Sequence, residues 1–164
     1  MRYLSTRGEA STLSFTDALL AGLARDGGLY VPQSYPTLDA ATIAGFAGRP
    51  YAQVAQEVIG PFMGGEIASD AFTAMLEASY ATFRHPAVTP LAQIGDNLFV
   101  LELFHGPTLA FKDVAMQLLA RLYDYALAAQ GRTMTIIAAT SGDTGGAAVE
   151  AFRGARHARM AVLF

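Results

Sequence analysis

Lys112 is the single lysine of this 164-residue chain, and arginines carry all other fixed positive charge. It follows an apolar Leu-Ala-Phe run and a Gly-Pro turn, at the expected start of a helix. Apolar surroundings destabilise an ammonium group, so the pKa of such a lysine falls and a nucleophilic amine becomes available. The pattern therefore suits a lysine that forms a Schiff base with a carbonyl compound. The alternative is a lysine that extends from a helix start into solvent.

A second candidate group, Thr140-Ser141-Gly142-Asp143-Thr144-Gly145-Gly146, lies where an expected strand meets an expected helix. Binding sites of open α/β sheets lie at the carboxyl ends of strands, and free amides at a helix start favour an anion. The loop has neither a Walker motif nor the GxGxxG spacing of a dinucleotide site. Because Asp143 would repel a bare phosphate, a substrate carboxylate fits better. The alternative is an ordinary strand-to-helix turn whose small residues pack closely.

The elements that must position these groups follow from capping residues, apolar spacing and Gly/Pro stops. Residues 1–87 are predicted to form a mostly helical region, and residues 88–164 a β-hairpin followed by a β-α-β-α-β segment. The fold class is therefore α/β, a helical half followed by a small, mostly parallel sheet with helices on both faces. The expected helices cover about residues 14–24, 37–47, 50–59, 69–84, 111–129 and 143–153, and the expected strands cover 91–94, 98–103, 133–139 and 159–164.

The two candidate groups lie one β-α-β step apart, so in a parallel sheet both face the same edge. An amine that can form an imine, beside a pocket for an α-carboxylate, is the minimal requirement for amino-acid chemistry on pyridoxal phosphate.

Composition excludes several other classes of function. The net charge of -3 and pI near 5.5 argue against a nucleic-acid partner, and the absence of cysteine excludes disulfides and thiolate chemistry. No His, Asp or Glu pair has convincing metal-ligand spacing, so no metal is expected. The chain has no signal-peptide core and no apolar run of membrane-spanning length, which makes a cytoplasmic location the expectation.

Three motifs carry a resemblance to a known family. They are Asp26-Gly27-Gly28-Leu29-Tyr30-Val31-Pro32, the run from Phe104 to Asp113, and the loop from Thr140 to Gly145. In this order they resemble the threonine synthase family, which belongs to the fold type II (β-family) pyridoxal-phosphate enzymes with αβα layers. Other members of that wider class typically carry Asn where this chain has Asp143, which favours threonine synthase.

The resemblance implies a role for each site residue. Lys112 would hold pyridoxal 5'-phosphate as a Schiff base and shuttle protons between substrate carbons, and Phe111 would pack beside the cofactor ring. Asp143 would lie near the phenolic oxygen of the cofactor. The residues that would hold the substrate α-carboxylate are Ser141, Gly142, Thr144 and Gly145. The implied reaction converts O-phospho-L-homoserine and water to L-threonine and phosphate.

Family members are much longer, and their cofactor-phosphate loop follows later in the sequence. The chain is therefore expected to be the N-terminal part of such an enzyme, with a further catalytic region beyond residue 164. Alone, it is expected to be inactive and to bind the cofactor poorly or not at all. Two alternatives remain: another fold type II lyase or dehydratase of amino acids, or a non-catalytic binding module that keeps the fold. His105 is a further candidate for the mouth of the active site.

Overall fold

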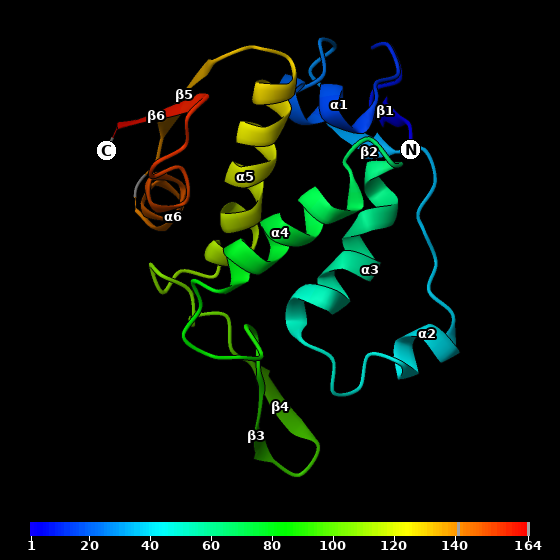
Figure 1. Cartoon of the computed structure of the whole chain (residues 1–164), viewed down its shortest axis with the longest axis vertical. Helices are drawn as coiled ribbons and strands as arrows, with labels where there is room; N and C mark the ends of the chain where they lie inside the picture. Colours follow the sequence, from blue (N-terminus) through cyan, green and yellow to red (C-terminus); the bar gives the residue numbers. More distant parts are fainter. Residues whose placement is uncertain (141, 164) are drawn as a thin grey trace. The chain divides into compact units, whose positions relative to one another are not determined.

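The computed structural model describes residues 1–140 and 142–163, with six helices and six strands among them (Figure 1). It is a mixed α/β structure, as predicted from the sequence. The chain divides into two compact units, a first unit of Met1–Ala74 and a second unit of Met75–Phe164.

The first unit contains two short strands and three helices, and it shares a fourth helix with the second unit. These elements are β1 (Tyr3–Ser5), α1 (Phe15–Ala21), β2 (Tyr30–Pro32), α2 (Ala40–Ala44), α3 (Tyr51–Met63) and α4 (Ser69–Tyr80).

β1 and β2 form an antiparallel pair that depends on Asp26. The Asp26 carboxylate accepts hydrogen bonds from the Ser5 hydroxyl at 2.7 Å and from the backbone N–H groups of Glu9, Ala10 and Gly28 at 2.9 to 3.0 Å. These bonds, that from Ser5 foremost, lower the pKa of Asp26 to about 2. A side chain at position 28 would overlap the Ser5 hydroxyl, which explains the glycine there. The Asp-Gly-Gly motif thus stabilises the N-terminal turn.

The helices of the first unit begin close to where the sequence predicts. Ser14, the first residue of the expected helix at 14–24, caps α1 by accepting a hydrogen bond from the Asp17 N–H at 3.2 Å. The helix ends at Ala21, three residues early, because Leu23 pairs with Leu29 in a β-bridge. In contrast, α3 continues past the expected stop at residue 59.

The second unit carries both candidate groups. In addition to the end of α4, it contains β3 (Leu91–Gly95), β4 (Leu98–Leu101), α5 (Asp113–Ala129), β5 (Met134–Ala139), α6 (Asp143–Ala151) and β6 (Ala158–Leu163).

The predicted hairpin is confirmed, but it does not join the parallel sheet. β3 and β4 pair antiparallel around a turn in which Asn97 adopts a φ of 56°. β5 pairs in parallel with β6 alone among the described strands, with Ile136 opposite Met160. The sequence-based expectation of one sheet containing residues 98–103 and both later strands is therefore replaced by two separate two-stranded sheets.

The parallel pair is covered on one face within the described part of the chain. α5 and α6 pack against each other and against β6, and residues alternate along both strands between covered and exposed positions. Ile137 and Leu163 lie on the open face with 71% and 63% of their surfaces exposed. The expected second helical layer is not formed by these residues, because both available helices pack on the same side.

Small side chains allow α5 and α6 to approach closely. α6 buries Ala147, Ala148 and Ala151, and α5 buries Leu118, Leu122 and Leu127. α5 is about 25 Å long and β5 about 20 Å, and only residues 130–133 connect them. The chain therefore reverses there, so the start of α5 and the end of β5 lie toward the same end of the second unit (Figure 1).

Candidate active site

Lys112 is the residue immediately before α5, at the N-cap position. Its side chain is half-buried, and its Nζ atom lies 4.4 Å from the centroid of the Phe111 ring. The ring itself is 57% exposed. The apolar contact that the structure gives this amine is one face of a largely exposed aromatic ring.

The loop before Lys112 is built around Asp113, a residue that sequence reasoning did not assign to the site. Asp113 has 0% of its surface exposed. Its carboxylate accepts hydrogen bonds from the Thr108 backbone N–H at 2.8 Å and from the Thr108 hydroxyl at 2.7 Å. A Cβ atom at Gly106 would overlap the Asp113 side chain, so only glycine allows this approach. The available sequence signal was an aspartate directly after the single lysine, in the first turn of an expected helix.

The second candidate group surrounds the start of α6. The Thr140 hydroxyl oxygen accepts hydrogen bonds from the N–H groups of Gly145 at 3.0 Å and Gly142 at 3.4 Å. Asp143 is exposed as the first residue of the helix, and Thr144 is half-buried. Within residues 1–140 and 142–163, no acceptor binds the N–H groups of Asp143 and Thr144. Ser141, predicted as a substrate ligand, lies outside the described residues.

The structure brings the two groups to one end of the second unit but not into direct contact. Lys112 precedes α5, Gly142 precedes α6, and the two helices pack together. Among the residues that the structure describes, no hydrogen bond joins the two loops. The Lys112 amine and the N–H groups of Asp143 and Thr144 therefore belong to helix starts at the same end of the second unit.

His105 is engaged in contacts of its own. Its Nε2 atom lies 2.7 Å from Oε2 of Glu102, and its ring centroid lies 5.1 Å from that of His85. These contacts join the histidine to the segments on both sides of the hairpin, His85 before it and Glu102 after it. They do not test the prediction that His105 lies at the mouth of the active site.

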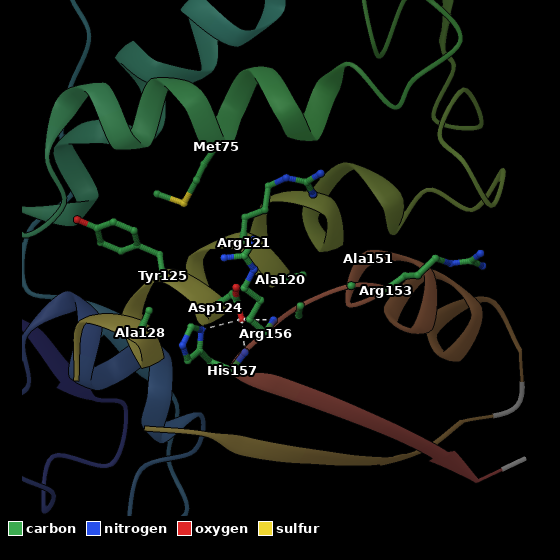
Figure 2. Close-up of a pocket in the computed structure, with 12 residues that line it drawn as sticks. Met75, Ala120, Arg121, Asp124, Tyr125, Ala128, Ala151, Arg153, Arg156 and His157 are labelled. Carbon is green, nitrogen blue, oxygen red and sulfur yellow. Dashed lines mark hydrogen bonds and ion pairs between the residues drawn. The ribbon is translucent and has the colours of Figure 1, made fainter. Parts of the chain in front are cut away.

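A pocket of about 500 Å³ lies away from these loops, beside the turn that leads into β6 (Figure 2). None of the predicted site residues lines it. Asp124 fastens the turn, since its Oδ1 atom accepts hydrogen bonds from the backbone N–H groups of Arg156 and His157 at 2.9 and 2.6 Å. The Arg153 side chain extends away from the pocket and pairs with Glu150 at 2.6 Å (Figure 2). The ionisable side chains of Asp124 and His157 line the pocket and lie 3.5 Å apart, but they hold the turn before β6. Because no predicted site residue lines the pocket, the lysine loop remains the candidate site.

The described residues contain neither a cluster of metal-ligating side chains nor a membrane-spanning helix. No group of three or more His, Asp or Glu side chains in that part of the chain could hold a metal ion. No helix there is long and apolar enough to span a membrane.

Comparisons with known proteins point to one family. A family profile described as "Threonine synthase N terminus" matches residues 2–80. A threonine synthase of Pseudomonas aeruginosa is 56% identical over 93% of this chain and 33% of its own length. A crystal structure of pyridoxal-phosphate-bound threonine synthase from Brucella melitensis is 61% identical, with a TM-score of 0.98 over 100% of this chain and 35% of that one. Yeast threonine synthase is 38% identical, with a TM-score of 0.92 over 98% and 35% of the two chains.

The chain spans about a third of the length of these relatives. The matched structures superimpose on nearly all of it.

Proposed function

Because the chain belongs to the threonine synthase family, we propose that it supplies the lysine that carries pyridoxal 5'-phosphate in a complete threonine synthase. The observation that carries this proposal is Lys112, the single lysine of the chain, which lies at the start of α5 beside an exposed aromatic ring. The Brucella melitensis neighbour is described as bound to pyridoxal phosphate, which supports the same cofactor here.

The residues around Lys112 suit the reactive end of this cofactor. The Lys112 amine is accessible, and the Phe111 ring beside it offers a surface for the cofactor ring. Asp143, exposed at the start of α6, is the group proposed to lie near the phenolic oxygen. When bound, pyridoxal phosphate withdraws electrons from a substrate carbon. Lys112 would hold the cofactor covalently and, once released by the substrate, its amine would accept and return protons at the substrate carbons.

The start of α6 is proposed to bind the α-carboxylate of the amino-acid substrate. The N–H groups of Asp143 and Thr144 are the candidate donors, aided by the positive end of the helix dipole. The Gly145 N–H already donates to Thr140, so Gly145 would contribute close packing rather than a donor. Ser141 and Gly142 complete the proposed carboxylate loop.

The substrate proposed for the complete protein is O-phospho-L-homoserine. The γ-phosphate would leave by elimination and water would add at the β-carbon, which yields L-threonine and phosphate. Assignment to fold type II and a cytoplasmic location belong to the same proposal.

The role of Lys112 can be tested by covalent trapping of the cofactor. Because the chain alone is expected to bind the cofactor poorly, it is incubated with a large excess of pyridoxal phosphate, so that borohydride reduction traps a weakly populated imine. The reduced protein is then digested with trypsin. Modification of Lys112 blocks cleavage there, so a labelled peptide from His85 to Arg121 is expected. Lys112→Arg, which keeps the charge, should give no label in this segment. Labelling of the N-terminal amine alone would contradict the proposal.

The substrate can be tested in a chimera. This chain replaces the corresponding N-terminal third of the Brucella melitensis enzyme, to which it is 61% identical. The chimera should form threonine from O-phospho-L-homoserine, and its Lys112→Arg variant should not. Activity on another phospho- or hydroxy-amino acid, without threonine formation, would identify a different lyase of the same class.

A further inference from the structure

We infer that Asp113 is a positioning residue, whose buried carboxylate holds residues 106–112 in the conformation that presents the Lys112 amine. This inference rests on the proposed function of Lys112. It assigns to Asp113 no contact with cofactor or substrate.

The Asp113 carboxylate accepts its hydrogen bonds from the preceding loop and not from its own helix. A carboxylate in the first turn of a helix commonly accepts hydrogen bonds from free amides of that turn. Here both hydrogen bonds come from Thr108, five residues earlier, and α5 has no side-chain cap. Asp113 therefore closes the loop behind Lys112 instead of capping α5.

The closed loop contains a strained residue. Leu109 adopts a φ of 66°, a left-handed conformation that is costly for a leucine. Its side chain is 52% exposed, so little apolar burial offsets this cost. The neighbouring bonds from Thr108 to Asp113, and from the Leu109 N–H to the Gly106 carbonyl at 3.2 Å, hold the loop in this shape. Conformational strain retained in this way is typical of functional loops.

Lys112 lies directly beside the anchored residue. The Asp113 N–H donates to the Ala110 carbonyl at 3.0 Å, while its carboxylate binds Thr108. The backbone of Lys112 is thus fixed from both sides of the loop, and its ammonium rests over Phe111. Without the Asp113 bonds, we expect the loop to relax and the amine to sample many positions.

The single lysine makes the position of this amine directly measurable. Reductive methylation with ¹³C-formaldehyde labels Lys112 and the N-terminal amine, so NMR of the full chain shows one lysine signal. In Asp113→Asn, the chemical shift and the linewidth of the Lys112 methyl signal should both approach the values of a free lysine. In the trapping reaction with pyridoxal phosphate, the rate of labelling at Lys112 should fall about tenfold, the effect of losing one charge-assisted hydrogen bond.

Asp124→Asn is the matched control. Asp124 lies on the same helix and also accepts two hydrogen bonds, in its case both from backbone N–H groups at the turn before β6. This variant should leave the Lys112 signal and labelling rate unchanged even where it lowers thermal stability. If Asp113→Asn and Asp124→Asn changed the Lys112 NMR signal and labelling rate by the same amount, Asp113 would be merely structural. That result would overturn the inference.

Thr108→Val provides a second test if Asp113→Asn does not fold. It removes the hydroxyl donor and keeps the backbone donor, so a smaller shift of the Lys112 signal in the same direction is expected. A signal identical to wild type would also overturn the inference. Failure of wild-type Lys112 to react with pyridoxal phosphate would instead contradict the proposed function. The NMR comparison of the variants would still test the role of Asp113.

Discussion

Two buried or half-buried carboxylates shape the motifs on which the family resemblance rests. Asp26 gathers four hydrogen bonds in the N-terminal turn, and Asp113 gathers two in the lysine loop. Each stands beside a glycine that a larger side chain could not replace without overlap, Gly28 and Gly106. At the residue scale, these motifs therefore combine groups for chemistry with groups that only fix a loop.

Asp26 should make folding stability depend on pH. Its pKa is lowered to about 2, whereas an unfolded aspartate has a pKa near 4. Its stabilising contribution is therefore complete above about pH 4 and is lost as the pH falls toward about 2. In urea unfolding, Asp26→Asn should be less stable than wild type at about pH 6, and the difference should shrink at about pH 2.5.

Asp96→Asn is the control for this experiment, since no hydrogen bond to the Asp96 carboxylate occurs among the described residues. It should unfold like wild type at both pH values. If Asp26→Asn lost the same stability at both pH values, ionisation of Asp26 would not be linked to folding stability.

At the scale of elements, α6 shows why two adjacent glycines have different roles. A Cβ atom on Gly145 would lie 3.0 Å from Val162 Cγ1 and 3.2 Å from Thr140 Oγ1. A Cβ atom on Gly146 would meet nothing within 4 Å. Gly145 therefore allows α6 to sit close to β6 and to the end of β5, whereas Gly146 faces open space.

Alanine substitutions should separate these two roles. Gly145→Ala should lower the free energy of unfolding by about 1–3 kcal/mol, because overpacking displaces α6. Gly146→Ala should raise it by about 0.5–1 kcal/mol, because alanine favours a helix. Chemical denaturation of both variants measures the difference. Equal effects of the two substitutions would mean that α6 does not pack as closely as the structure indicates.

At the scale of the whole molecule, the chain leaves large apolar surfaces open. The open face of the parallel pair exposes Ile137 and Leu163, and the hairpin exposes side chains along both strands. Exposed strands of this kind favour association with other chains. The division of the chain at residues 87 and 88 remains a prediction.

Substitutions on opposite faces of β5 should have opposite consequences. Ile137→Thr replaces the ethyl group of an exposed isoleucine with a hydroxyl and should reduce self-association, with stability changed by less than about 0.5 kcal/mol. Ile136→Thr, on the covered face, should cost about 1–3 kcal/mol. Sedimentation velocity and chemical denaturation check the two outcomes. Unchanged self-association in Ile137→Thr would show that this face is not the one involved.

The sequence by itself determined the type and approximate bounds of most elements. Ser14, Gly131 and the Gly95-Asp96-Asn97 turn are local signals, and apolar spacing marks α4, α5 and both parallel strands. Such signals act over a few residues and need no knowledge of the fold. The unique lysine and the three motifs were sufficient to indicate the family that the comparisons bear out.

Only the tertiary structure decided which strands pair and what surrounds Lys112. β1 was missed because three residues carry too weak a pattern, and its partner β2 lies far along the chain. The separation of the hairpin from the parallel pair, and the single covered face, likewise depend on long-range packing. Burial of Asp113 is a property of the folded loop, since a charged residue is ordinarily exposed and only its bonds to Thr108 make burial favourable.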